Sequence, residues 1–517
     1  MTFEIVFVLL SLLGMVAALV ADKMRPGMIL FSVVVLFLCA GILTPKEMLE
    51  GFSNKGMITV ALLFLVSEGI RQSGTLGQVI KKLLPQGKTS VFKAQLRILP
   101  SVAFISAFLN NTPVVVIFAP IIKHWAKSVN LPATKFLIPL SYVTILGGIC
   151  TLIGTSTNLV VHGMILEAGF EGFSMFELGK VGIFIAIAGI IYLFIFSKRL
   201  LPDARPDTAV PDEEVEEGEK LHRVEAVLGA RFPGINKKLS DFNFQRHYGA
   251  EVKEIKTRNG QRYVDHLEDV VLREGDTLVV MADDTFIPTW GESSVFVLLT
   301  NGNDPDTSGK KKRWLALILL VLMIVGATVG ELPATKEMFP DIKLDMFFFV
   351  CITTIIMAWT NIFPARKYTK YISWDILITI ACAFAISKAM VNSGVADCVA
   401  GFIIGLSDDY GPHVLLAILF VITNLFTELI TNNAAAALAF PLALSISAQL
   451  GVSPTPFFVV ICMAASASFS TPIGYQTNLI VQGIGNYKFT DFVRIGLPLN
   501  IITFLISVIL IPLIWNF

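Results

Sequence analysis

Long apolar stretches recur along the whole of this 517-residue chain, and they limit its fold more than any other feature. A helix needs about 20 mainly apolar residues to cross a bilayer. Only 15% of the residues are charged, well below the roughly one quarter that is usual in soluble domains. We therefore predict an α-helical polytopic membrane protein in the cell membrane, surrounded by lipid. The predicted crossings are 4–21, 27–43, 57–72, 133–153, 176–197, 314–330, 344–360, 373–390 and 495–515, with a shorter, interrupted one from 456.

The charged and metal-binding residue types argue against several classes of function. The chain has 40 basic and 40 acidic residues, so no nucleic-acid partner is expected. The 6 cysteines and 6 histidines are scattered singly, which favours neither disulfides nor a zinc site. No nucleophile, base and orienting group come together in a motif. We therefore expect neither an enzyme nor a bound cofactor, apart from a coupling ion.

The composition changes abruptly between the basic pair at 198–199 and the basic run at 310–313. The part between them has an acidic linker, short β-type runs and an Asn-Gly hairpin signal at 259–260. Flanking basic residues place this insert in the cytosol. We predict a first membrane repeat at 1–199, a linker and small α/β cytosolic domain at 200–312 with its core at 220–290, and a second membrane repeat at 313–517.

Two motifs of the first half recur in the second half at a nearly constant offset. LNNTPVVVIFAPI (109–121) matches ITNNAAAALAFPL (430–442), 321 residues later, and GTSTNLVVHG (154–163) matches GYQTNLIVQG (474–483), 320 residues later. This pairing indicates an internal duplication. An odd number of predicted crossings separates equivalent points, so the second copy is upside down in the membrane. The prediction is two inverted repeats of about five transmembrane helices, each with one re-entrant hairpin, as in secondary transporters.

Each Asn-rich motif lies between two apolar limbs, at 91–109 and 113–125 in the first half and at 412–430 and 434–449 in the second. As a helix the shortest limb is only about 20 Å long, less than the roughly 30 Å hydrocarbon core. The limbs therefore fit re-entrant hairpins, whose tips would meet in mid-membrane.

The hairpin tips and the Gly-Thr-rich motifs supply the candidate binding residues. Glycine and proline in the second pair of motifs suit helices that break inside the membrane, where freed carbonyls need partners. Carbonyl, amide and hydroxyl oxygens can bind Na⁺, and amide groups at half-helix N-termini can receive an anion. The alternative is that these small polar residues only hold helices together. The candidates are Asn110, Asn111, Thr112, Gly154, Thr155, Ser156, Thr157, Asn158, Thr431, Asn432, Asn433, Gly474, Thr477 and Asn478.

Two carboxylates inside predicted helices have a second interpretation. Glu68 and Arg71 are three residues apart on one helix face and can neutralise each other. Glu428 lies just before the second tip, so it would face either the site or a counter-charge on another helix.

At these residues the chain resembles the divalent anion/sodium symporter family, which includes citrate- and sulfate-type permeases of the ion transporter superfamily. Members carry two Ser-Asn-Thr tips on re-entrant hairpins, one in each inverted repeat. The central Asn is kept here as Asn111 and Asn432. The resemblance implies sodium bound through these two residues and a dianion beside the tips. Asn433 replaces the family's Thr, which counts against a dicarboxylate.

The insert resembles the C-terminal ligand-binding domain of Trk-type (TrkA) potassium regulators. NKKLSDFNFQRHYGAEVKEIK (236–256) and VLREGDTLVVMA (271–282) carry this match. Symporters with such inserts include a sulfate-transport and sulfur-starvation subgroup, so the resemblance favours sulfate or a related oxyanion, with a dicarboxylate left open. It also implies a homodimer and an unknown regulatory ligand at the insert. A passive cytosolic spacer is the alternative.

The combined hypothesis is Na⁺-coupled symport of a small inorganic or carboxylate anion by an elevator-type mechanism. A proton-coupled antiporter or an arsenite-type efflux permease of the same superfamily stays open, as does an anion sensor without transport. A channel is disfavoured because the chain lacks a Thr-Val-Gly-Tyr-Gly type filter.

Overall fold

The computed structural model describes most of the chain. The residues it does not describe are 1–2, 22–23, 86, 88, 204–221, 230, 258–260, 284–285, 287–289, 291–294, 301–309, 340 and 406–410. The acidic linker and the predicted Asn259-Gly260 turn therefore lie outside the described residues.

The chain before the insert is helical. Its helices are α1 (Phe3–Ala21), α2 (Pro26–Cys39), α3 (Pro45–Glu50), α4 (Lys55–Gln72), α5 (Thr75–Leu83), α6 (Val91–Ser106), α7 (Asn111–Ser128), α8 (Thr134–Gly148), α9 (Ser156–Glu167) and α10 (Gly179–Leu200).

The chain after the insert is helical as well. Its helices are α13 (Lys310–Gly330), α14 (Pro333–Met338), α15 (Met346–Trp359), α16 (Tyr368–Tyr371), α17 (Trp374–Asn392), α18 (Val395–Gly405), α19 (Gly411–Leu429), α20 (Asn432–Leu450), α21 (Thr455–Ser466), α22 (Gln476–Gly485) and α23 (Phe489–Ile514).

Length and apolar composition make this a multi-pass membrane protein. In the described part of the chain, 8 helical segments are long and apolar enough to cross a membrane. Four shorter apolar helices accompany them, among them α2 and α15 at predicted crossings. Burial divides the helices into two kinds. Every residue of α8 is buried, whereas α1 buries only Val8 and Met15 and exposes apolar side chains elsewhere. An exposed apolar helix face is what a lipid environment requires.

The two Asn-rich motifs form helical hairpins, as predicted. In the first, α6 ends at Ser106 and α7 begins at Asn111; in the second, α19 ends at Leu429 and α20 begins at Asn432. The limb after the first tip is longer than the sequence predicted, because α7 continues through its internal Pro120 to Ser128.

The Gly-Thr-rich motifs break helices, also as predicted. The first break, residues 149–155, separates α8 from α9, and the second, residues 467–475, separates α21 from α22. We call these segments break 1 and break 2, and we call residues 107–110 and 430–431 with the first turn of the following helix tip 1 and tip 2.

The insert is a small domain around one antiparallel sheet. Its strands are β1 (His222–Leu228), β2 (Glu251–Lys256), β3 (Arg262–Tyr263), β4 (Thr277–Ala282) and β5 (Phe296–Thr300), in the order β3-β2-β4-β1-β5, and its short helix is α11 (Phe244–Tyr248). Pairing of Lys256 with Arg262 shows the predicted hairpin between β2 and β3. The sheet extends beyond the predicted core of 220–290, since β5 follows that core in the sequence and pairs with β1.

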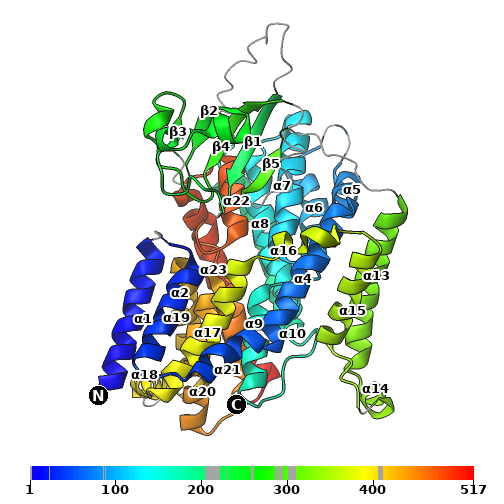
Figure 1. The fold of residues 1–517 in the computed structure, drawn as a ribbon. Coiled ribbons are helices and arrows are strands. Elements are labelled where there is room, and N and C mark those ends of the chain that lie inside the picture. Colours follow the sequence, from blue (N-terminus) through cyan, green and yellow to red (C-terminus); the bar gives the residue numbers. More distant parts are fainter. Residues whose placement is uncertain are drawn as a thin grey trace, which may run out of the picture.

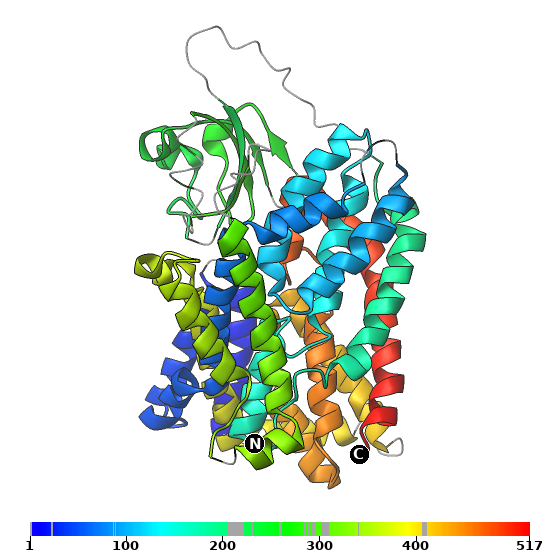
Figure 2. The same cartoon turned by 90° about the vertical axis from the view of Figure 1, so that its right-hand side faces the viewer.

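The insert covers one end of the helical body, and both termini lie at the other end (Figure 1). The view turned by 90° shows the same separation (Figure 2). The insert and the two termini therefore lie at opposite ends of the helical body (Figures 1 and 2).

Contacts between described residues join the insert to the helices, among them those of Lys123, Gly483 and Arg231. On α7, the ammonium of Lys123 lies 3.1 and 3.0 Å from the two carboxylate oxygens of Glu225 in β1. On α22, a methyl group added at Gly483 would lie 2.5 Å from the Thr277 hydroxyl, so strand β4 packs closely there. Arg231 donates a hydrogen bond of 3.3 Å to the Ile372 carbonyl, between α16 and α17.

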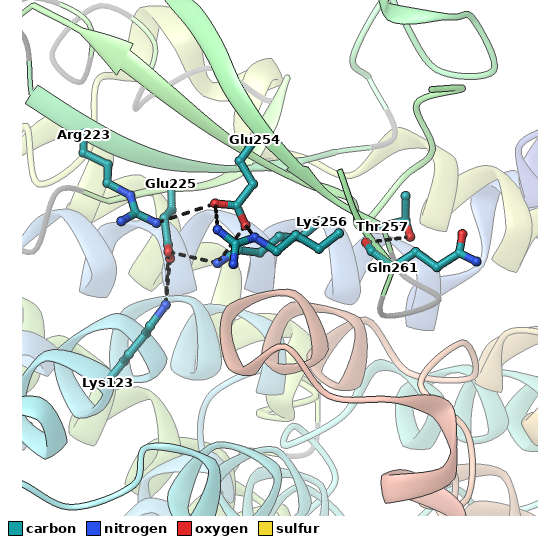
Figure 3. A network of polar contacts seen from close by, with 8 residues as sticks. Lys123, Arg223, Glu225, Glu254, Lys256, Thr257 and Gln261 are labelled. Carbon is teal, nitrogen blue, oxygen red and sulfur yellow. Dashed lines mark hydrogen bonds and ion pairs between the residues drawn. The ribbon is translucent and has the colours of Figure 1, made fainter. Parts of the chain in front are cut away.

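The Lys123–Glu225 pair is one end of a charge network that continues into the sheet (Figure 3). The Lys256 ammonium lies 3.6 Å from the Glu225 carboxylate and 3.9 Å from that of Glu254, which also pairs with Arg262 at 2.5 Å. Glu254 and Lys256 are only 2% and 5% exposed, so the centre of this network lies away from solvent. Paired buried charges of this kind cost several kcal/mol when one partner is removed.

We expect Lys123→Ala to loosen the insert from α7, because Glu225 would lose its two short contacts with the α7 ammonium. The loss should be about 1 kcal/mol or more, which is roughly a fivefold rise in hydrogen exchange over residues 222–228. Lys238→Ala is the matched control, since the Lys238–Asp269 pair is largely exposed. Equal exchange in Lys123→Ala and the wild type would contradict this role of the pair.

Candidate functional site

The starts of four helices come together inside the helical body, two from each half. Tip 1 contacts break 2: the Asn111 side-chain amide donates to the Tyr475 hydroxyl at 2.6 Å, and the Thr112 hydroxyl donates to the Gln476 side chain at 3.4 Å. The Tyr475 hydroxyl also lies 3.1 Å from the Thr155 hydroxyl of break 1. The starts of α7, α9 and α22 are therefore neighbours.

Tip 2 contacts the first turn of α9, directly after break 1, in the same crosswise manner. The side-chain oxygen of Asn433 accepts hydrogen bonds from the Ser156 and Thr157 hydroxyls, at 3.3 and 3.2 Å. Each tip therefore meets the broken helix of the other half, and α20 joins the other three helix starts.

None of these four helix starts has a side-chain cap. The N-cap residues of α7, α9, α20 and α22 are Asn110, Thr155, Thr431 and Tyr475, and none accepts a hydrogen bond from its helix. Ser90 caps α6 and Asp345 caps α15, but other starts such as those of α8 and α17 are uncapped too, so what sets these four apart is their convergence. The first turns of a helix leave N–H groups without intrahelical partners and carry a partial positive charge. Four converging uncapped starts can therefore receive an anion without any basic side chain.

The same hydrogen bonds fix the tip and the break in each half. In the first half, the Asn111 side-chain oxygen accepts from Ser106 at 2.7 Å, and Thr151 donates to the Ala107 carbonyl. In the second half, the Asn432 oxygen accepts from Thr427 at 2.8 Å, and Thr471 donates to the Glu428 carbonyl at 3.1 Å.

The second asparagine of each pair closes its break by the same bond. Asn158 donates to the Thr151 carbonyl at 2.9 Å, and Asn478 donates to the Thr471 carbonyl at 3.1 Å. The residues in these bonds are separated by the offsets of 320 and 321 that the sequence shows. The similarity of the two motifs thus extends to their three-dimensional bonding.

Close backbone approaches at glycines bring oxygen atoms together beside each tip. A methyl group on Gly148 would lie 2.7 Å from the Asn111 side-chain oxygen and 3.1 Å from the Gly154 carbonyl, and one on Gly154 would lie 3.0 Å from the Ala107 carbonyl. In the second half, a methyl group on Gly474 would meet the Ser468 hydroxyl and the Thr427 carbonyl. Hard oxygen atoms converging at an unwound backbone are the ligands that suit Na⁺.

Burial divides the predicted site residues into two sets. Asn110, Thr112, Ser156 and Thr431 are partly exposed, so they border accessible space. The predicted residues that are buried are Asn111, Gly154, Thr155, Thr157, Asn158, Asn432, Asn433, Gly474, Thr477 and Asn478. The structure thus places every predicted residue at a tip, in a break or in the first turn of the helix that follows a break.

Two hollows near tip 1 share one lining residue. A hollow of about 1180 Å³ opens near α14, at the end of the body away from the insert (Figure 1). Its lining includes Lys55, His162 and Leu159. Leu159 also lines a small cavity beside Asn110 and Ser156. The two hollows therefore approach each other at this side chain.

Comparison with known proteins decides the family. The model of the citrate transporter family matches residues 16–447 and 338–517. The chain belongs to the citrate transporter family. An uncharacterized transporter of Synechocystis is 30% identical over 94% of this chain and 93% of its own length. Similarity extends to a probable sodium/sulfate cotransporter 3 of Chlamydomonas reinhardtii, with 23% identity over 93% of this chain and 85% of the relative. A sodium-dependent dicarboxylate transporter of Staphylococcus saprophyticus is 20% identical over 91% of this chain and 78% of the relative.

Sequence reasoning missed three side chains in this transporter's site. Ser106 and Thr427 each bond the central Asn of a tip, and both stand five residues before it, so the duplication itself could have identified them. Tyr475 bonds both Asn111 and Thr155. In the sequence, Tyr475 is recognisable only as a difference between the two repeats, because it occupies the position that Thr155 holds in the first half.

The two charged candidates have clear places. Arg71 donates to both carboxylate oxygens of Glu68, at 2.7 and 2.6 Å, which confirms that they neutralise each other. Glu428 faces no counter-charge among the residues that the structure describes, so that alternative is wrong for this part of the chain. Its carboxylate accepts hydrogen bonds from the Ser470 amide and the Asn500 side chain.

Gly154→Ala should destabilise the transporter, because the added methyl group would meet backbone atoms of Gly148 at 2.5 and 2.7 Å, and these cannot turn away. Overpacking of this kind costs about 1–3 kcal/mol. The measurement is the midpoint of thermal unfolding in detergent. Gly14→Ala is the control, since nothing lies within 4 Å of the new methyl group; a loss of stability as large as that of Gly154→Ala would refute the packing argument.

Tyr475→Phe should weaken the contact between tip 1 and break 2, since it removes the hydroxyl that bonds Asn111 and Thr155. Leaving buried polar groups without partners costs about 1–3 kcal/mol. The midpoint temperature of thermal unfolding should fall in Tyr475→Phe. It should fall much less in Tyr263→Phe, because the hydrogen bond of that hydroxyl, in the insert, is exposed. Equal shifts would show that Tyr475 does not join the two halves.

Proposed function

We propose that this protein is a Na⁺-coupled symporter of a divalent oxyanion, with sulfate favoured and a dicarboxylate as the alternative substrate. The observation that carries the proposal is the convergence of four uncapped helix starts from two halves. No basic side chain takes part in the bonds across these starts. Helix N-termini with hydroxyl and amide groups suit a compact anion such as sulfate.

The anion would lie between the partly exposed residues of the four starts. Thr112 and Ser156 offer hydroxyl groups there, and the Thr431 hydroxyl is buried without a partner. Na⁺ would occupy the oxygen clusters beside Asn111 and Asn432. Because the Asn111 side chain bonds both its own limb and Tyr475 of the other half, a sodium ion there would stiffen the wall of the anion space. Both ligands would then favour the same conformation, so binding of the sodium ion would strengthen binding of the anion.

The names of the similar proteins support this choice of substrate and coupling ion. One similar protein is named for sodium and sulfate and another for sodium and dicarboxylates. Asn433 bears on the choice between these anions, because its side chain is occupied by bonds to Ser156 and Thr157 instead of offering a hydroxyl to substrate.

The transport step in this proposal is an elevator movement. The tips and breaks would move together as one unit, since they are bonded crosswise, while the lipid-facing helices stay in place. The inverted relation of the two halves supplies the second, opposite-facing state.

The insert would act on this movement as a cytosolic regulatory domain. It contacts α7 and α22, which both begin at the site, and through Arg231 it also contacts the segment before α17. A regulatory ligand would shift transport only if it bound one of the two states more tightly. The resemblance to Trk-type regulator domains and the homodimer stay predictions.

The test is uptake into liposomes that contain the purified protein. Labelled sulfate should enter only with an inward Na⁺ gradient, and Asn111→Ala with Asn432→Ala should lower the initial rate at least tenfold, because each substitution removes an oxygen from its tip. Asn392→Ala is the control, since its amide bonds only the Ile42 carbonyl and Glu47. Uptake driven by a proton gradient and indifferent to Na⁺ would favour the antiporter or efflux alternative.

A further inference from the structure

Glu428 is a membrane-embedded carboxylate whose second oxygen is unpartnered. It stands near the end of α19, four residues before Asn432 of tip 2. Its Oε1 accepts a hydrogen bond of 2.8 Å from the Ser470 amide and one of 2.7 Å from the Asn500 side chain. Its Oε2 is buried and has no partner.

Asn500 of α23 presents a second unpartnered oxygen at the same place. Its side chain is buried, with 6% exposed. The Nδ2 group donates to Glu428 and, at 2.8 Å, to the Ser470 hydroxyl, while Oδ1 is buried without a donor. Three elements, the end of α19, break 2 and α23, thus bring two free acceptors and a hydroxyl oxygen together.

No positive charge in the described chain compensates this carboxylate. The ion pairs among the described residues do not include Glu428, and its hydrogen-bond donors are neutral groups. Glu68, by contrast, is bound by both nitrogens of Arg71. An uncompensated carboxylate inside a membrane protein is costly and marks an ion site or pathway.

The first half shows that the fold does not need these polar groups. At the offsets of 321 and 320, Glu428 and Ser470 correspond to Ala107 and Cys150. The backbone framework is the same, because Thr151 donates to the Ala107 carbonyl as Thr471 does to that of Glu428.

The position of Asn500 also has an apolar equivalent. Gly182 of α10 packs against the Ile149 carbonyl, and Gly496 of α23 packs against the Phe469 carbonyl, its equivalent in the other break. Counting four residues on from each glycine pairs Asn500 with Ala186, which is buried. The same framework therefore forms around an alanine, a cysteine and an alanine.

We propose that Glu428, Asn500 and Ser470 form a sodium site, separate from the oxygen clusters at Asn111 and Asn432. The ligands would be Glu428 Oε2 and Asn500 Oδ1, with the Ser470 hydroxyl beside them. A bound sodium ion neutralises the carboxylate and ties tip 2 to break 2 and α23, so it orders the wall of the anion space. The choice of sodium rests on the proposed function, whereas the need for a cation rests on the geometry.

The experiment counts ²²Na⁺ bound to the purified full-length protein in detergent, without any transport step. Glu428→Gln should bind one sodium ion fewer per chain than the wild type. Glu68→Gln is the matched control and should bind the wild-type number, because Arg71 already compensates that carboxylate. If Glu428→Gln binds the same number of sodium ions with the same affinity as the wild type, the proposal is overturned. This holds even if the substitution changes how sodium binding depends on pH.

A second variant covers a failure of Glu428→Gln to fold. Asn500→Ala keeps the carboxylate and removes one ligand, so one class of sodium ions should bind about tenfold more weakly. Unchanged affinity would overturn the site. The count also separates this proposal from symport: if the counts differ as expected while liposomes show no Na⁺-driven uptake, the sodium site stands and the symport proposal fails.

Discussion

The structure depends on four helix N-termini that are turned toward one another inside an apolar body. Unpaired N–H groups at a helix start are costly away from water unless a cap, water or a ligand satisfies them. The starts of α7, α9, α20 and α22 have no side-chain cap and lie close to one another. A place where four partial positive charges converge is stable when an anion occupies it.

The crosswise bonding explains how distant segments hold this arrangement. Asn111 and Tyr475 are 364 residues apart, and Thr157 and Asn433 are 276 residues apart, yet each pair is hydrogen-bonded. Glycines at the breaks let carbonyls approach the tips, which brings together oxygen atoms suited to a cation. The insert contacts α7 and α22, two of the four helices whose starts converge. The tips, the breaks and the insert are therefore joined by a short chain of contacts.

Much of this architecture could be predicted from sequence, for physical reasons. Apolar length locates the helices, and the repeated Asn and Gly-Thr motifs locate the tips and breaks, because hydrocarbon tolerates such residues only where they have partners. The pairing of tip 1 with break 2 could not be predicted, since it depends on how two halves pack. Tyr475 was missed for the same reason: its partners, Asn111 and Thr155, belong to the other half. Glu428 was recognised as unusual, but only the structure shows that its partners are neutral.

The most direct test of the central claim is to locate a bound anion. Crystals of the protein grown with Na⁺ and selenate, an analogue of sulfate with an anomalous scatterer, would give a peak at the selenium position. The account predicts one peak between Thr112, Ser156, Thr431 and Gln476, within hydrogen-bond distance of the helix-start amides. A peak in the hollow beside Lys55 and His162, with none between the four helix starts, would contradict it.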